Sequence, residues 1–313
     1  MEEKTKLTQD IAAVTPLPVK KIFRYFKGLP RRMRIYYDAY LLGNRISKRE
    51  ILGALRKLGV KDGSTIAVHS SLSRLGFVEG GAQAVIDALI EAVGKEGTII
   101  MPAFSGFTQS KANLVFDVRN TESKTGIITE TFRKMQGVKR SLHPISSVCA
   151  YGRKAEFIVK GHEKHTRFFE ENTPFHKLMQ LNGDIVLLGA DIDTVSFFHV
   201  VEDCVKGFPI RVYEKKPRIL KAIDENGKLR AIKAYAHDLD VHEYCIDDNP
   251  AVISRMRALL EKAGVLKTVS LGKGKASLLN SRKLMQEMQK LTKKGITIYA
   301  SEEEQKHKHE KAP

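Results

Sequence analysis

His199 and Glu202 are the residues of this chain whose types and spacing best suit acid–base chemistry. They are three positions apart, so in a helix the imidazole and the carboxylate lie on one face. A carboxylate beside an imidazole fixes the tautomer of the ring and stabilises the imidazolium that forms when the ring takes a proton. A surface ion pair would show the same spacing, but the apolar neighbours Phe197, Phe198 and Val200 favour a buried pair.

A group of hydroxyl side chains follows the apolar run at residues 66–68: Ser70, Ser71 and Ser73 come directly after His69. Hydroxyls and backbone N–H groups at the carboxyl end of a buried strand suit an anionic or thioester ligand. An ordinary loop with serine caps is the alternative, because isolated loop motifs often mislead.

Other polar residues carry weaker signals. Pro144 restricts His143 to extended geometry, so this histidine could hold a ligand carbonyl or phosphate, or could be structural. Asp238 and Asp240 point the same way if their segment is extended. Such a pair could receive a cationic amine, or it could be a solvated turn. The remaining histidines lack the spacing of metal ligands, so we assign no metal; they include His162, His165, His176, His307 and His309.

The composition indicates a globular cytoplasmic protein. The 313 residues include three cysteines, an odd number far apart in the sequence, which favours reduced thiols. No run of about 18 apolar residues is present, and no secretory signal is recognisable. The net charge of +17 favours anionic partners. The basic residues are spread along the whole chain without a nucleic-acid-binding motif, so we expect no nucleic acid partner.

The elements that must position these residues form an α/β pattern. Residues 65–102 read as strand, polar turn, helix and strand, a βαβ unit that requires a partly parallel sheet. We therefore expect a three-layer α/β/α fold with a mixed sheet. Residues 105–123 read as irregular and 161–173 as a mobile charged loop. Further elements are expected at residues 47–58 (helix), 184–188 (strand), 195–205 (helix), 213–235 (hairpin turning at Asn226-Gly227), 250–263 and 281–291 (helices).

Both ends of the chain differ in composition from the middle. Residues 1–44 mix basic and aromatic side chains and predict a helical extension that docks on the protein or lies on an anionic membrane surface. Residues 301–313 have too little apolar content to fold and predict a disordered charged tail. A catalytic domain is expected between them, at residues 45–300.

Several segments together resemble the aminoglycoside 3-N-acetyltransferase family of acetyl-CoA-dependent enzymes, over about residues 46–291. They are VHSSLSRLGFVEGG, EGTIIMPAFSG, FDVRNTESKTGIITETFRKMQGVKRSLHPISSVCAYG, NTPFHKLMQLNGDIVLLGADIDTVSFFHVVE and, more weakly, VSLGKGKASLL. Each motif alone is unspecific. The HSSLS turn, the SLHP segment and the HxxE pair in this order are specific.

The resemblance implies an α/β acetyltransferase with acetyl-CoA as co-substrate and no metal. It implies that His199 is the general base and Glu202 its partner. The HSSLS turn would lie along the pantetheine and thioester, and the SLHP segment near the coenzyme; their residues are Ser70, Ser71, Leu72, Ser73, Ser141 and His143. Asp238 and Asp240 would grip a cationic acceptor, with Thr108 standing where some members carry an acidic residue.

The acceptor stays open at this level. An aminoglycoside or amino-sugar-like amine is the first expectation, although the strong positive charge of the chain fits a polycation poorly. A sugar of a surface polysaccharide or a lipid-linked sugar is the alternative, with peripheral membrane contact through residues 1–44. A basic non-enzymatic binding protein is a second alternative. We also expect a homodimer.

Overall fold

The computed structural model describes residues 45–106 and 115–301. The described residues from Ile46 to Ser301 belong to one compact unit. The expected extension at residues 1–44, the expected tail at 301–313 apart from Ser301, and Thr108 lie outside the described residues. Within the described ranges, no helix combines the length and the apolar character needed to cross a membrane.

A seven-stranded mixed sheet forms the centre of the fold. Strand β2 pairs in parallel with both β4 and β8, and the remaining neighbours pair antiparallel. This confirms the partly parallel sheet expected from the βαβ unit. From edge to edge the strands are β11 (Leu266–Leu271), β12 (Gly274–Asn280), β8 (Asp184–Leu188), β2 (Thr65–Ser70), β4 (Thr98–Pro102), β7 (Val148–Gly152) and β6 (Lys139–Arg140).

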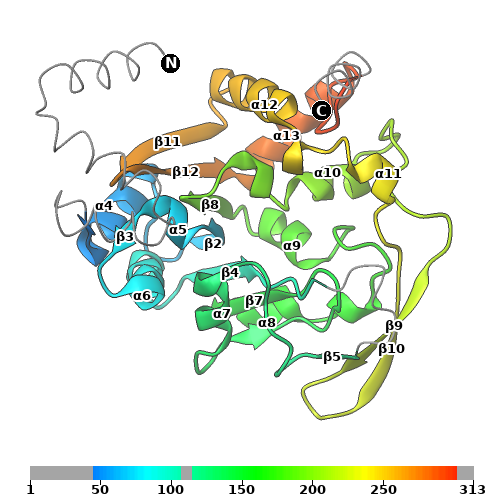
Figure 1. Ribbon diagram of the computed structural model, residues 1–313, viewed down its shortest axis with the longest axis horizontal. Helices are drawn as coiled ribbons and strands as arrows, with labels where there is room; N and C mark the ends of the chain where they lie inside the picture. The colour runs from blue at the N-terminus through cyan, green and yellow to red at the C-terminus, as the bar shows by residue number, and fades with distance from the viewer. Residues whose placement is uncertain (1–44, 107–114, 302–313) are drawn as a thin grey trace, which may run out of the picture. The chain divides into compact units, whose positions relative to one another are not determined.

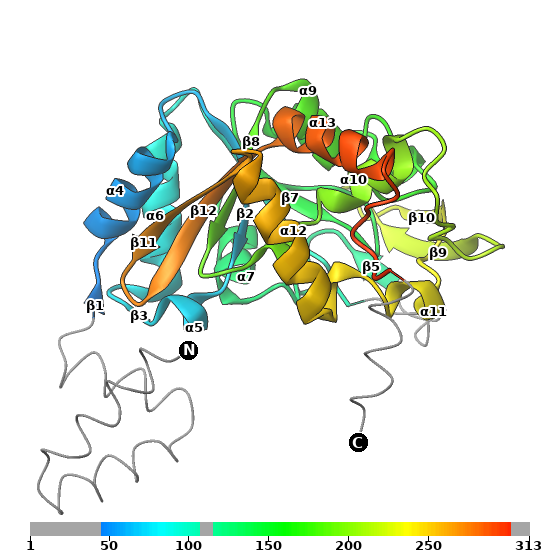
Figure 2. The ribbon, with the colours of Figure 1, turned by 90° about the horizontal axis from the view of Figure 1, so that it is seen from above.

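Helices cover both faces of this sheet, which gives the expected three layers (Figures 1 and 2). Alternate residues of one strand serve opposite faces: Ile66 and Val68 of β2 pack in one core cluster, and Ala67 packs in the other. The first cluster lies against α4 (Lys48–Leu58), α5 (Leu72–Leu75), α6 (Gly81–Val93) and α7 (Ile127–Arg133). The second lies against α8 (Ala155–Val159), α9 (Pro174–Gln180), α10 (Phe198–Cys204), α12 (Pro250–Lys262) and α13 (Ser281–Thr292).

Local signals in the sequence place several of these boundaries. Ser47 and Glu50 form a capping box at the start of α4, and Gly59 ends that helix with φ 106°, a left-handed conformation that favours glycine. The short strands β1 (Arg45–Ile46) and β3 (Phe77–Val78) lie before α4 and before α6.

A separate three-stranded sheet contains the expected hairpin. Strands β9 (Arg218–Ile223) and β10 (Leu229–Ala234) pair antiparallel on either side of Asn226-Gly227. Strand β5 (Val115–Asp117) pairs in parallel with β9. The expectation of irregular structure throughout residues 105–123 was therefore wrong at β5, because its pairing partner lies about a hundred residues further along the chain and leaves no local signal.

Two other expectations need correction. The predicted helix at residues 195–205 begins only at Phe198, because Val195 has extended geometry and follows a 3₁₀ turn, Ile192–Thr194. The mobile charged loop expected at residues 161–173 is packed into the protein: His162 and Phe168 are buried, and His162 Nδ1 shares a 2.9 Å hydrogen bond with Ser141 Oγ. The aromatic side chains of this segment anchor it in the protein despite its charged residues.

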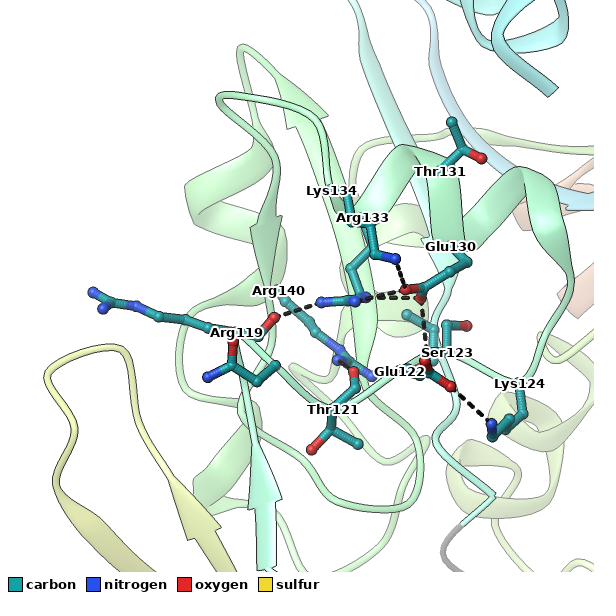
Figure 3. Close-up of polar contacts among 12 residues, drawn as sticks. Arg119, Thr121, Glu122, Ser123, Lys124, Glu130, Thr131, Arg133, Lys134 and Arg140 are labelled. Atoms are coloured by element: carbon teal, nitrogen blue, oxygen red, sulfur yellow. Dashed lines mark hydrogen bonds and ion pairs between the residues drawn. The ribbon is translucent and has the colours of Figure 1, made fainter.

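A polar network around Glu130 of α7 fixes the segment that follows β5 (Figure 3). The Glu130 carboxylate accepts hydrogen bonds from Arg133 (2.6 Å) and from the Ser123 backbone N–H (2.9 Å), and Lys134 pairs with it at 3.0 Å. The hydrogen bond from Arg133, followed by that from Ser123, lowers the pKa of Glu130 to about 2 although partial burial opposes the shift. Arg140 donates to the carbonyl oxygens of Thr121 and Ala103 and thereby ties this segment to β4.

Replacing Glu130 with Gln should lower the free energy of unfolding at pH 7 by about 1–2 kcal/mol, because two charge-assisted contacts are lost. The folded pKa of Glu130 lies below its usual value, so this stability is present above pH 4.5 and disappears as the pH falls toward 2. Denaturant unfolding at pH 7 and pH 3 measures the difference. Glu122→Gln is the control, because the pair of Glu122 with Lys124 is exposed and should contribute little. Equal losses in both variants would contradict the role of Glu130.

Candidate active site

A cavity of about 470 Å³ opens at the carboxyl ends of the parallel strands β2, β4 and β8. We call it the first cavity. Ser70 and Ser71 enter its wall at the end of β2, Pro102 at the end of β4, and Ala190 just after β8. The amino end of α10 adds His199. The structure therefore brings the predicted serine turn and the predicted base into one cavity, as expected where parallel strands end at a common edge.

His199 and Glu202 form a buried pair. His199 Nδ1 donates to Glu202 Oε1 at 3.0 Å, and the Glu202 side chain has no solvent exposure. Tyr299 OH donates to the same carboxylate oxygen at 2.9 Å. His237 Nε2 lies 3.7 Å from the other oxygen of this carboxylate. These contacts exclude the surface ion pair that the spacing alone allowed, and they fix the Nδ1–H tautomer that leaves Nε2 of His199 for a substrate.

Electrostatics favour the charged form of this pair. Burial alone would lower the pKa of His199, but the charge of Glu202 and the hydrogen bond to it outweigh burial and raise the pKa to about 9. Burial alone would raise the pKa of Glu202, and His199 likewise reverses that direction and lowers it. At neutral pH the pair is therefore an imidazolium and a carboxylate, and His199 can act as a base only after it loses its proton.

The serine turn is partly committed to the backbone of the sheet. The Ser71 N–H donates to Leu188 O at 2.9 Å, and Ser71 O accepts from Arg74 and Leu75 in the short helix α5. The Ser71 backbone N–H thus cannot also donate to an oxyanion, so this one donor of the turn is not available for the ligand that the sequence suggested. Leu72 and Ser73 do not line the first cavity, whereas Ser70 and Ser71 do.

Ser141 and His143 lie apart from the first cavity, in a buried histidine cluster. His143 has no solvent exposure, and its Nδ1 accepts a hydrogen bond from the Ser146 N–H at 3.2 Å. Its ring stacks on His162 with centroids 4.6 Å apart. Ser141 Oγ accepts from the Val148 N–H at 2.9 Å. Burial lowers the pKa of His143 to about 3, so this ring is neutral. The contacts fit structural roles, and a coenzyme role for either residue stays a prediction.

Asp238 and Asp240 do not form the expected extended pair. Asp238 is the N-cap of α11 (Leu239–His242), where its Oδ1 accepts from the Asp240 N–H at 3.2 Å. Asp240 is exposed, and neither residue lines the first cavity. An Asp two residues before another is as typical of an N-cap as of a strand, and the sequence could not decide between the two. A role in binding the acceptor stays a prediction for both.

Sequence reasoning missed two carboxylates that do line the first cavity, Asp193 and Asp247. Asp193 Oδ1 is buried and has no hydrogen-bond partner, and burial raises the pKa of this carboxyl. Asp247 Oδ2 lies 3.5 Å from His242 Nε2. Asp193 lies shortly after the carboxyl end of β8, and this position could have predicted its place in the cavity wall. Asp247 lies far along the chain, and no feature of the sequence predicted its place in the cavity wall.

Three histidines gather beside the first cavity: His199, His237 and His242. Their candidate ligand atoms lie within 4.8 Å of one another. Two ligands of one tetrahedral zinc ion lie only about 3.3 Å apart, as follows from a Zn–N distance of about 2.0–2.1 Å. As they stand, the rings are therefore spaced more loosely than a zinc site requires.

Solved structures of aminoglycoside acetyltransferases share this fold. AAC(3)-IVa, solved as the apoenzyme, is 25% identical with a TM-score of 0.68, and the match covers 83% of this chain and 93% of that chain. AAC-IIIb, solved as a binary complex with CoASH, is 20% identical with a TM-score of 0.68, covering 82% of this chain and all of that one. At that identity the second likeness shows the fold alone.

The sequence comparison is more specific. The model of a family described as aminoglycoside 3-N-acetyltransferase matches residues 67–293, and this chain belongs to that family. A curated relative is the SPbeta prophage-derived aminoglycoside N(3')-acetyltransferase-like protein YokD of Bacillus subtilis (strain 168), which is 36% identical over 176 residues. That alignment covers 50% of this chain and 64% of YokD. The chain thus matches less than two thirds of the length of this relative.

Replacing Tyr299 with Phe should raise the pKa of His199 further, because Glu202 loses one of its two hydrogen-bond donors and holds the imidazolium more strongly. Unfolding free energy should fall by about 1.5–3 kcal/mol, the usual contribution of a hydrogen bond to a charged group. NMR titration of the His199 ring measures the pKa. Tyr213→Phe is the matched control, since Tyr213 OH donates to Asp203 rather than to Glu202. An unchanged His199 titration in Tyr299→Phe would contradict this role.

Proposed function

We propose that this protein transfers the acetyl group of acetyl-CoA to an amine of an aminoglycoside or amino-sugar-like acceptor. The observation that carries the proposal is the presence of a buried His199–Glu202 pair in the same cavity as Ser70 and Ser71. A base that is oriented by a carboxylate, next to hydroxyl groups at the carboxyl edge of a sheet, suits acyl transfer by proton abstraction from an incoming nucleophile.

The proposed reaction is a direct transfer without an acyl-enzyme. The acceptor nitrogen attacks the thioester carbonyl carbon, a C–N bond forms, and the C–S bond breaks. His199 Nε2 takes the proton that the nitrogen loses, and this proton then passes to the departing thiolate to give CoA. Glu202 stabilises the imidazolium in between, through the Nδ1 hydrogen bond of 3.0 Å. General-base assistance of this kind contributes about 10²–10⁴ in rate.

Support for the coenzyme comes from the cavity wall and from the relative that was solved with CoASH. The hydroxyls of Ser70 and Ser71 line the first cavity and can donate to the thioester carbonyl as negative charge develops on its oxygen. Side-chain donors are needed there, because the Ser71 N–H is already bonded to Leu188.

Support for a cationic acceptor comes from Asp193 and Asp247 in the same cavity as His199. A mutant of AAC(3)-IVa was solved in complex with apramycin. In this chain, an ammonium group next to Asp193 would compensate the buried carboxylate oxygen that has no hydrogen-bond partner. The membrane contact and the homodimer remain expectations from the sequence.

Replacing His199 with Ala should reduce turnover by about 10²–10⁴-fold and leave the affinity for CoA within about twofold, because the base acts on the acceptor and not on the coenzyme. Thiol release from acetyl-CoA, measured across a panel of aminoglycosides and amino sugars, gives the rate. Calorimetry with CoA gives the affinity. His176→Ala is the control, since His176 lies outside the first cavity. No thiol release with any acceptor, or undiminished release in His199→Ala, would overturn the proposal.

The rate should rise with pH, reach half its maximum near pH 9 and level off above that pH. His199 is protonated below its raised pKa of about 9 and becomes a base only above it. Glu202→Gln removes the charge that raises this pKa, so burial dominates and the midpoint should move below 6.5 while the limiting rate falls. Both profiles of kcat against pH are recorded with one acceptor, so that titration of the acceptor amine is common to them. Superimposable midpoints would contradict the assignment of His199 as the base.

A further inference from the structure

A second cavity, of about 550 Å³, lies on the other side of the catalytic pair. Glu202 lines this second cavity, whereas His199 lines the first. Its wall comes from the end of α10 and from the chain that follows, and it is partly apolar, with Phe208 and Ile210 among the lining residues. None of the residues expected from the sequence to bind a ligand lines it.

The acidic residues of the second cavity each bind groups of the protein, although one buried oxygen each of Glu202 and Asp203 has no hydrogen-bond partner. Asp203 accepts hydrogen bonds from Tyr213 OH at 2.8 Å and from the Phe169 N–H at 3.2 Å, and burial raises the pKa of its carboxyl to about 7. Glu214 accepts two hydrogen bonds from Arg218, at 2.6 and 3.0 Å. Glu202 carries its charge against His199. The charges of Glu202 and Glu214 are thus paired with His199 and Arg218, and the raised pKa of Asp203 reduces its negative charge near neutral pH.

The basic residues of the second cavity are not neutralised in this way. Arg167 lies 3.9 Å from Asp203 and over the Tyr213 ring, at the limit of an ion pair. Lys206, Arg211 and Lys215 line the cavity, are exposed, and make no ion pair with any acidic residue in the described part of the chain. Four cations thus line one cavity beside three carboxyl groups that are paired or partly protonated, so the local potential is positive.

We propose that the second cavity binds a phosphate group, held by Lys206 and Arg211 at its mouth. Arginine and lysine together suit a phosphate, the first by its planar pair of donors and the second as a point charge. The carrier of the phosphate is either the acceptor sugar or the coenzyme, which ends in a phosphate monoester. The choice of these two carriers rests on the proposed function, whereas the phosphate site itself is inferred from the residues of the second cavity.

The test compares binding with and without the phosphate. Calorimetry measures Kd for glucosamine against glucosamine 6-phosphate, and for CoA against 3'-dephospho-CoA. In the wild-type protein we expect the phosphate to strengthen binding by about tenfold or more in one of the two pairs, with a preference that weakens as salt is added. The pair that shows the preference identifies the carrier.

The charge-reversal variant Lys206→Glu/Arg211→Glu should abolish that preference and bring the two ligands of the pair within about twofold. Arg49→Glu/Lys57→Glu is the matched control, because it makes the same change at exposed positions of α4. The inference is overturned if neither pair shows a preference, or if the preference survives in the cavity variant. These measurements need no turnover, so their outcome is separate from the outcome of the thiol-release assay.

Discussion

A fully buried carboxylate is the constraint on which the site depends. Removing the charge of Glu202 from water costs several kcal/mol unless partners replace the lost hydration. Its hydrogen-bond donors are His199 from the same helix and Tyr299 from the segment after α13. His237, from the segment after β10, lies 3.7 Å from the other carboxylate oxygen without a hydrogen bond between them. The chain can therefore keep Glu202 charged only when the segments of Tyr299 and His237 have folded onto α10.

Backbone contacts hold the segment that carries Tyr299 in place. Ala300 N–H donates to Tyr244 O at 2.9 Å, and Cys245 and Tyr299 form an isolated β-bridge. These bonds hold the Tyr299 ring in place, so that its hydroxyl reaches Glu202. The segment that carries Asp247 toward the first cavity is therefore bonded to the segment that carries Tyr299, and the two support one wall of the cavity and the carboxylate beside His199.

The sequence predicted those parts of the site that depend on short-range spacing. The i, i+3 spacing of His199 and Glu202 requires only a helix, and the position of Ser70 and Ser71 requires only the end of a strand. The capping box and the hairpin around Asn226-Gly227 are equally local. The resemblance to a family then linked these local signals before any geometry was known.

The parts that the sequence did not predict depend on distant partners. Tyr299 meets Glu202 across 97 positions, and no local pattern marks it. Strand β5 exists because β9 pairs with it. Asp238 is a different case. Its position in the sequence is typical both of an extended segment and of a helix N-cap, and the structure shows the N-cap. The periodicity of the sequence predicts the direction in which a side chain points, whereas the identity of its partner depends on the tertiary structure.

The two cavities also change what the overall charge implies. A net charge of +17 spread over the chain suggests that a polycationic acceptor would be repelled. At physiological ionic strength, however, the Debye length is about 8 Å, so charges on the far surface are screened and the residues lining each cavity decide. The first cavity offers Asp193 and Asp247 beside Arg74, and the second offers four cations beside the carboxyl groups of Glu202, Asp203 and Glu214. A ligand with an amine at one end and a phosphate at the other would match both, whereas a ligand of uniform positive charge matches only the first.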